Sequence, residues 1–422
     1  MSKSRKELRQ ETVDLINGLS RQTLLKEFAI SRVAEITGLD TIGIPVYTCV
    51  RALSRTISIH AGKGILPSYA RAGSILEAIE FEAAENPVGK FLLNRAAAIP
   101  EEEHLDLDDA FPARSSILSE LTPLAWESMT NIQNGESKLI PSDLIWLVPR
   151  VENQPLMYVQ MGTNGLAAGA ALEDAILSAL YEVIERDAWT LSQYLLDTCG
   201  IVPTRCPLAG LPPRLESAVR KIEAAKLRLH LFDITTDYSV PVFSAILIDR
   251  SGNCAGTFGG YGCHINAEIA AIRAVTEAVQ GRCCYISGAR DDMFRRQFLL
   301  MKRMDQERLD QMFSELPMGG PLPEYRVVNF PNVQHELRYV LRLIKQHGVS
   351  QVFAKELGSF LDDRIKVVRV FTPQCEPFRF DHWTPGLRCL TYVKRRLDAL
   401  SKITEPKVTE EEDEEGEAWK NS

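Results

Sequence analysis

The sequence predicts a mixed α/β (α+β) protein that contains repeated strand–Gly turn–helix units. Two observations support this fold class. Strand-like and helix-like segments alternate along the chain, and one helical pattern occurs three times, each time after a glycine-containing segment. The chain has 422 residues, 45% hydrophobic and 25% charged, which is typical of a globular protein. This length allows two or three domains, or one large domain with insertions.

In the first part of the chain, we expect a helical segment over residues 1–44 and a main domain over residues 45–395. The main domain begins with the strand-like "IGIPVYTCVRAL" and continues with "ISIHAGKGI", a predicted strand and Gly-rich turn. The segment "YARAGSILEAIEFEAAEN" is then predicted to be a helix. Residues 87–140 contain scattered apolar positions, prolines and acids, which indicates loops with short elements.

The second part repeats this order. "DLIWLVPRV" and "PLMYVQM" are predicted strands, "GTNGLAAGA" a Gly-rich turn, and "ALEDAILSALYEVIERDA" a helix. An amphipathic helix at 213–227 and strands at 228–235 and 241–249 lead to a third Gly-rich turn and helix. Residues 324–371 predict a strand, a helix and two more strands. The acidic stretch 404–422 is predicted to be a disordered tail.

Charge and cysteine content exclude several classes of protein. The formal net charge of -8 argues against a nucleic-acid binder, which needs a basic face. The nine cysteines form an odd number without a C-x-x-C pair, so free thiols are expected rather than a disulfide framework or a zinc site. The N-terminus has no apolar signal-peptide core, and no apolar run is long enough for a membrane span. We therefore expect a cytoplasmic protein without a membrane partner.

The repeated helix places carboxylates and small residues in register. Three copies align at 70–82, 175–187 and a third segment entered at residue 270. The aligned positions are Glu77, Glu182 and Glu277; three residues later Glu80, Glu185 and Gln280; three earlier Ser74, Ala179 and Ala274; and seven earlier Ala70, Ala175 and Ala270.

At about 100° per residue these positions form one stripe along the helix. The small residues leave room for something to approach closely, and we expect that to be a nucleotide. Neighbouring carboxylates repel unless a cation lies between them. Mg²⁺ can bridge carboxylates to phosphates, and arginines can bind phosphate oxygens. With Arg186, Arg273 and Arg282 nearby, the pattern favours a metal–nucleotide site. A solvated helix face, a pure metal site and a sugar-cleaving carboxylate pair remain alternatives. The standard Gly-rich phosphate motifs are absent.

Three segments together resemble the YcaO family: "GKGILPSYARAGSILEAIEFE", "TNGLAAGAALEDAILSALYEVIERDA" and "GYGCHINAEIAAIRAVTEAVQGRCCYISGARDD". The resemblance covers roughly residues 45 to 395, and the third segment is most similar to the branch that works with TfuA proteins. It implies a YcaO-type fold around a central nucleotide site. It also implies that ATP and Mg²⁺ are used to phosphorylate the oxygen of a peptide backbone amide. In that branch a TfuA-like partner delivers sulfur and a thioamide forms in a ribosomally made peptide or protein.

The resemblance also assigns roles to individual residues. It implies metal ligands at Glu77, Glu80, Asp174, Glu182 and Glu185. Arg186 and Arg282 are implied to contact phosphates with Gln280 beside them, and Lys63 and Ser74 to contact the nucleotide. Glu182, Glu185, Arg186 and Arg282 are the expected catalytic residues.

Some positions depart from the family pattern. Ala170 replaces a polar residue, Asp174 replaces a glutamate, and Phe81 stands where an arginine is common. The chain lacks the Pro-x-Pro-x-Pro ending of azoline-forming members, and no leader-binding domain is evident. Thioamide formation is therefore the leading hypothesis. An azoline-forming cyclodehydratase and a non-catalytic scaffold that binds a peptide or partner are the alternatives. The oligomeric state is open, with a homodimer as one possibility.

The Cys263-His264 pair could indicate a thiol catalyst, but a buried cysteine is more commonly a small core residue.

Overall fold

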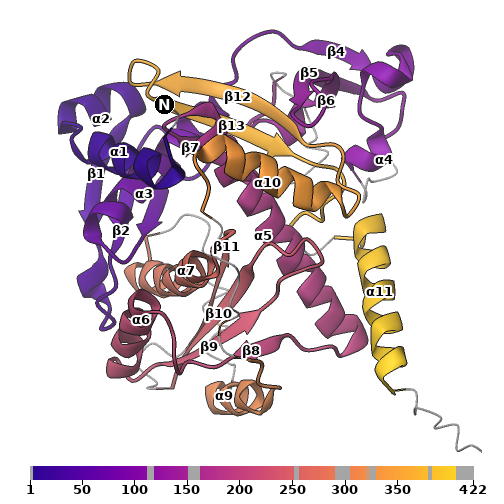
Figure 1. The fold of residues 1–422 in the computed structure, drawn as a ribbon. Coiled ribbons are helices and arrows are strands. Elements are labelled where there is room, and N and C mark those ends of the chain that lie inside the picture. The colour runs from indigo at the N-terminus through magenta and orange to yellow at the C-terminus, as the bar shows by residue number, and fades with distance from the viewer. Residues whose placement is uncertain are drawn as a thin grey trace, which may run out of the picture.

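The protein contains three antiparallel sheets with helices packed against them, which confirms the predicted mixed α/β class (Figure 1). The computed structural model describes residues 3–111, 118–150, 162–250, 256–289, 305–320, 322, 329–378 and 383–404. Within these ranges, every helix is too short or too polar to cross a membrane. The eight cysteines in the same ranges are free thiols.

The N-terminal sheet has the strand order β1-β2-β3, so β1 and β3 are its edges. Helices α2 and α3 pack on it, and α1 packs on α3. The predicted N-terminal helical segment thus holds two helices and also strand β1, which pairs with β2. The elements are α1 (Arg5–Asn17), α2 (Arg21–Phe28), β1 (Ile30–Glu35), β2 (Val46–Arg51), β3 (Ile59–Lys63) and α3 (Pro67–Glu85).

The second sheet has the order β11-β10-β9-β8, with β11 at one edge. Helix α7 packs on β10 and β11, α6 on α7 and β9, and α9 on β9 and β10. The elements are β8 (Thr204–Cys206), α6 (Pro213–Ala224), β9 (Arg228–Asp233), β10 (Val242–Asp249), β11 (Gly256–Cys263), α7 (Ala267–Ser287) and α9 (Gln306–Glu315).

The third sheet has the order β4-β5-β12-β13-β7, and β6 also pairs with β5. Helix α5 packs on β7 and β13, and α10 packs on α5. The elements are β4 (Leu92–Arg95), α4 (Leu107–Ala110), β5 (Pro123–Asn131), β6 (Ser137–Pro141), β7 (Leu166–Gly169), α5 (Leu172–Cys199), α10 (Val333–Lys345), β12 (Phe353–Phe360), β13 (Ile365–Phe371) and α11 (Leu387–Thr404).

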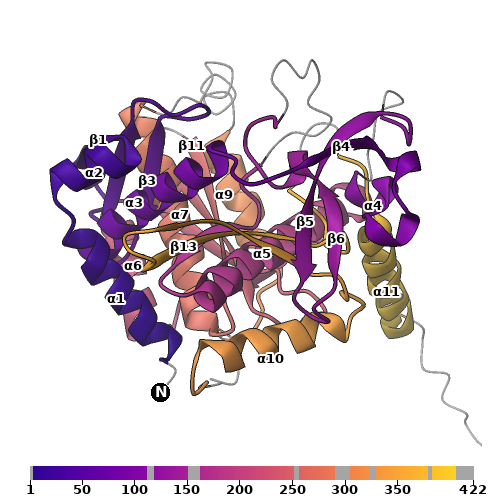
Figure 2. The same ribbon diagram turned by 90° about the horizontal axis from the view of Figure 1, so that it is seen from above.

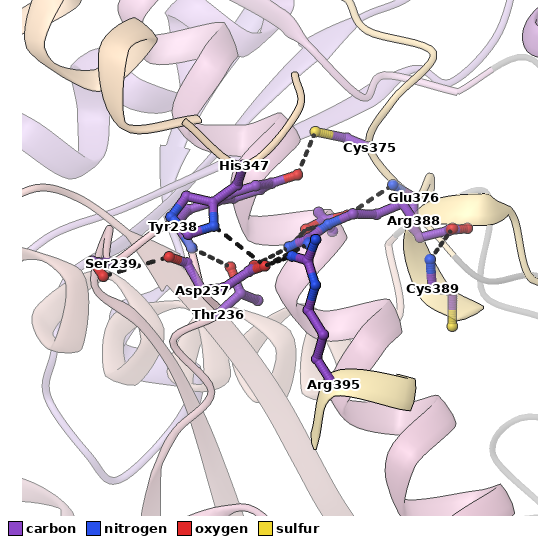
Figure 3. Close-up of polar contacts among 11 residues, drawn as sticks. Thr236, Asp237, Tyr238, Ser239, His347, Cys375, Glu376, Arg388, Cys389 and Arg395 are labelled. Atoms are coloured by element: carbon purple, nitrogen blue, oxygen red, sulfur yellow. Dashed lines mark hydrogen bonds and ion pairs between the residues drawn. The ribbon is translucent and has the colours of Figure 1, made fainter. Parts of the chain in front are cut away.

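Helix α5 connects the parts of the molecule, because it contacts strands of the second and third sheets as well as α10 and α11. Both views place α11 on the side of the molecule opposite α1, α2 and α3 (Figures 1 and 2). Arg388 of α11 donates a hydrogen bond to the buried Asp187 of α5 at 3.3 Å. It also donates to Asp237 (Figure 3). The Arg388 guanidinium also lies 4.2 Å from the centre of the Tyr238 ring. This cluster fixes α11 to the C-terminal half of α5.

Two sequence predictions about secondary structure differ from the structure. Over its described residues 143–150, the expected strand at 143–151 is a turn, in which the N–H groups of Ile145 and Trp146 both donate to the Ser142 carbonyl. Its apolar residues are consecutive because both side chains are buried in the core, not because the segment is a strand. Within 87–140 the structure has strands β4, β5 and β6 rather than mainly loops. The predicted strands at 155–161 and 324–328 and the acidic tail after residue 404 lie outside the described residues.

The Gly-rich segments before the repeated helices lie largely in strands β3, β7 and β11, and the predicted turn in the middle segment is confined to Asn164 and Gly165, before β7. Their glycines let each strand lie directly against its helix. A Cβ on Gly62 would come within 2.0 Å of the Ala70 carbonyl oxygen, and one on Gly262 within 2.1 Å of the Ala270 oxygen. The small helix residues therefore face a strand backbone. This corrects the expectation that they make room for a nucleotide.

Candidate active site

One large cavity of ≈ 1680 Å³ lies where the three repeated units meet. Strands β3, β7 and β11 each contribute to its wall, and each is the edge strand of a different sheet. Helices α1, α3, α5 and α7 also line this cavity. The repeat in the sequence thus becomes three neighbouring walls of one site.

Four of the predicted carboxylates face this cavity: Glu77 and Glu80 of α3, and Glu182 and Glu185 of α5. Three of them bind the edge strands directly. The N–H of Ala61 on β3 donates to Glu77 at 2.9 Å, and the N–H of Ala168 on β7 donates to Glu80 at 2.7 Å. The N–H of Cys263 on β11 donates to Glu185 at 3.0 Å. These bonds fix the carboxylates and satisfy edge amides that would otherwise be unpaired.

Burial and mutual repulsion raise the proton affinity of these carboxylates. Burial, with Glu77 and Glu182 nearby, raises the pKa of Glu80 well above its usual range. Burial and the charge of Glu185 raise the pKa of Glu182 to about 7. The pKa of Glu185 is also raised, by burial and by Glu277. A bound cation would relieve the repulsion among these carboxylates.

Among the described residues, no three His, Cys, Asp or Glu side chains are close enough to form a metal site by themselves. The carboxylate set nevertheless fits Mg²⁺, because Mg²⁺ is usually held by one or two carboxylates together with water and substrate phosphates. Glu77, Glu80, Glu182 and Glu185 are the residues that would hold it. Mg²⁺ bound there would neutralise phosphate charge.

Cationic side chains line the same cavity. Lys63 at the end of β3 pairs with Glu277 of α7. Burial alone would lower the pKa of Arg186, but Glu185 and Glu182 raise it, so the guanidinium stays protonated. The Arg186 guanidinium lies 4.9 Å from the centre of the Phe378 ring. Gln280 also lines the cavity.

Helix α1 adds cations that were not assigned to the site from the sequence. Removal from bulk water and the like charges of Arg273 and Arg5 lower the pKa of Arg9 to about 10. Arg9 and Arg273 make no ion pair with the described residues, although both line the cavity. Such a pair of cations is suited to an anionic ligand. The available signal was the spacing of Arg5 and Arg9, four residues apart on one face of a predicted helix.

Asp174 also lines the cavity, but it is buried and already paired with Arg5 of α1 at 3.3 Å. Arg5 in addition donates to Ser178 at 2.9 Å. Asp174 therefore anchors α1 against α5 in this structure and lies at the margin of the carboxylate set.

Two predicted residues are placed away from the cavity wall. Arg282 is buried and pairs with Asp40 at 3.0 Å and with Asp249 at 2.8 Å. Ser74 is buried, and its hydroxyl donates to the Arg71 carbonyl at 2.8 Å. The structure therefore does not bring Arg282 or Ser74 together with the carboxylates, and Arg273 is the arginine of α7 that faces them.

The Cys263-His264 pair is buried and uncharged. Burial raises the pKa of the Cys263 thiol well above its usual range and lowers the pKa of His264 well below its own. The His264 ring stacks on Tyr181, with ring centres 5.0 Å apart. Both side chains belong to the packing around the site.

A cavity with inward carboxylates on α3 and α5 and cations on α1, α5 and α7 is suited to a nucleotide held through Mg²⁺. The chain belongs to the YcaO family: residues 61–376 match the family model described as YcaO cyclodehydratase, ATP- and Mg²⁺-binding. The family model covers well over half of the chain.

Relatives extend this comparison. An uncharacterised protein of Methanothermobacter thermautotrophicus is 32% identical over 375 residues, covering 86% of this chain and 94% of its own. An uncharacterised protein from the tfuA 3′ region of Rhizobium leguminosarum bv. trifolii is 32% identical over 315 residues, covering 70% and 71%. The solved structure of YcaO from Methanopyrus kandleri, bound with AMPPCP and Mg²⁺, has the same fold. Its TM-score is 0.67 at 20% identity, and the match covers 90% of this chain and 96% of that one.

Proposed function

We propose that this chain uses ATP and Mg²⁺ to activate a backbone amide of a peptide or protein, and that sulfur then replaces the amide oxygen. The observation that carries the proposal is the convergence of four carboxylates with Arg9, Arg186 and Arg273 in one cavity. An amide oxygen is a poor leaving group, and transfer of the terminal phosphoryl group of ATP makes it a good one. In the net reaction, amide, hydrosulfide and ATP give thioamide, ADP and phosphate. The amide oxygen and the hydrosulfide proton leave with the phosphate.

In this proposal the carboxylates bind the cation and the arginines bind the phosphates. Glu80 and Glu185 each use one oxygen to hold an edge amide, which orients the carboxylate toward the cavity. Arg186 lies among Glu182, Glu185 and Glu277, so its charge is positioned next to the metal ligands. Arg9 and Arg273 supply positive charge from two other helices. This arrangement favours positioning and electrostatic stabilisation, the main contributions to phosphoryl transfer.

Sulfur is proposed as the nucleophile because one relative is named for its place in the tfuA 3′ region, and the match covers 71% of that relative. A TfuA-like protein is accordingly the proposed partner for sulfur delivery. Azoline formation is the competing reaction. There a side chain of the substrate attacks instead and water is lost from the peptide.

Mass spectrometry distinguishes these outcomes. The full-length chain is incubated with MgATP, sulfide, a TfuA-like protein and candidate peptides or proteins. Exchange of oxygen for sulfur is the expected product, and loss of water would replace the thioamide proposal with azoline formation.

A second measurement tests the enzyme against a scaffold that only binds a partner. Titration calorimetry with MgATP should show binding by wild type and weaker binding by Glu182→Ala. If the two proteins give the same result, the nucleotide site proposed here is wrong.

A further inference from the structure

Two glycines that line the cavity are not required by packing. A Cβ on Gly281 of α7 would meet only the Gly259 oxygen, at 3.9 Å. A Cβ on Gly259 of β11 would meet only the Tyr261 side chain, with the hydroxyl oxygen at 3.4 Å. Gly260 differs, because a Cβ there would come within 2.3 Å of the α7 backbone. A glycine inside a helix lowers its stability relative to alanine. Gly259 and Gly281, which both line the cavity, therefore form an open shelf.

Some main-chain N–H and C=O groups of β11 are directed to its outer edge, beside this shelf. Adjacent residues of a strand direct their N–H and C=O groups to opposite sides, and β10 occupies one side of β11. The N–H of Cys263 points to the outer side, because it donates to Glu185. By alternation, the main-chain groups of Tyr261, Gly259 and Thr257 point the same way. The proximity of the Gly259 oxygen to Gly281 agrees with this orientation.

We propose that the peptide substrate binds as an extended strand on the outer edge of β11, with its backbone on the Gly259–Gly281 shelf. This inference rests on the proposed function and adds the way in which the substrate is held. Main-chain hydrogen bonds to an unpaired edge strand are a recurring mode of peptide recognition. A glycine in a strand marks a place where another backbone comes close.

The distances connect the shelf to the reaction centre. Gly259 precedes Cys263 by four residues, about 14 Å along a strand. Gly281 lies one turn, about 6 Å, beyond Glu277 on α7. A peptide of a few residues therefore reaches from the shelf to the carboxylates. Thr257 and Cys284 line the cavity beside the two glycines and carry no formal charge, which suits a peptide backbone better than a phosphate.

The test uses a random dodecapeptide phage library selected on the MgATP-loaded full-length chain and counter-selected on Gly281→Leu. A selected peptide is synthesised with a fluorophore, and its Kd is measured by anisotropy. We expect Gly259→Ala and Gly281→Ala to raise this Kd at least tenfold. The Kd for MgATP and the melting temperature should stay unchanged, or the latter should rise for Gly281→Ala. Gly38→Ala is the matched control, because Gly38 has open space around it and lies outside the cavity lining.

N-methylation of the peptide backbone provides the second measurement. Strand pairing predicts loss of affinity at every other residue, together with slowed hydrogen exchange at the Gly259 amide. The inference is overturned if the selection enriches no peptide over the counter-selection. It is also overturned if the glycine variants bind like wild type, or if N-methylation has no alternating effect. If the variants lose MgATP affinity instead, the shelf holds the nucleotide. If wild type converts its substrate and the glycine variants bind the peptide as tightly as wild type does, this inference is wrong and the proposed function still stands.

Discussion

Replacing Glu182 by glutamine should stabilise the ligand-free protein and at the same time impair its response to MgATP. Glu182 is half-buried in the cavity beside Glu185, and its pKa is raised from 4.5 to about 7. Each tenfold change in proton affinity corresponds to about 1.4 kcal/mol, so the ionised carboxylate costs the folded chain about 3 kcal/mol. Water in the cavity screens part of this, which leaves about 2 kcal/mol as the expected gain for Glu182→Gln at high pH.

The sign of the pH dependence follows from the raised pKa. The folded chain binds the Glu182 proton more tightly than the unfolded chain. Below pH 4.5, the ordinary value for glutamate, both states are protonated and the variant should match wild type. As the pH rises from 4.5 through about 7, wild type loses this contribution and the variant does not. The difference in unfolding free energy should therefore be largest above neutral pH.

Urea unfolding at several pH values, with and without MgATP, measures both effects. Wild type should be stabilised by MgATP, because a ligand that binds only the folded state raises its stability. The variant should be stabilised less, because one cation ligand is missing. Glu223→Gln, on the exposed face of α6, is the control and should change neither quantity. Equal stabilisation of variant and wild type by MgATP, or a variant less stable than wild type at pH 8, would refute the reasoning.

Three further changes test the fold and the cation set. Arg388→Ala should lower the unfolding free energy by about 3 kcal/mol, because it leaves the buried Asp187 unpaired, and adding Asp187→Asn should recover most of the loss in denaturant unfolding. Gly62→Ala should lower the unfolding free energy by about 3 kcal/mol, because its Cβ would overlap the α3 backbone. Gly38→Ala should change the unfolding free energy by no more than about 0.5 kcal/mol. Similar unfolding curves for the two variants would contradict the packing argument. Arg9→Ala should weaken MgATP binding about tenfold in calorimetry, the loss expected for one phosphate contact, without lowering stability, because it removes repulsion from neighbouring arginines. Unchanged binding would exclude Arg9 from the nucleotide site.

The sequence was sufficient to predict which glutamates meet, because the register of a repeated helix determines the face on which each carboxylate lies. The same geometry could have separated the arginines of α7. At about 100° per residue, Arg273 lies about 40° from Glu277, whereas Arg282 lies about 140° away. Arg282 accordingly pairs with Asp40 and Asp249 on the other side of the helix.

Other features depend on contacts between distant segments and leave little trace in one sequence. The stripe of small residues predicts close approach, but not whether a ligand or a strand approaches. Only the positions of Gly62 and Gly262 against α3 and α7 show that it is a strand. The entry of Arg5 into the cavity likewise depends on its pairing with Asp174, which is 169 residues away.

The repeated unit links stability and chemistry through the same atoms. Each sheet presents an edge strand to the cavity, and an edge amide without a partner is unfavourable when it is removed from water. Glu77, Glu80 and Glu185 accept these amides, so their side chains are held in fixed orientations before any ligand binds. Held carboxylates lose little freedom on binding a cation, which is the advantage of a preorganised site. Edge β11 extends beyond its glutamate-capped amide to Gly259 and Thr257, which line the cavity. In the proposed mode of peptide binding, the edge that orients Glu185 also aligns a peptide amide with it.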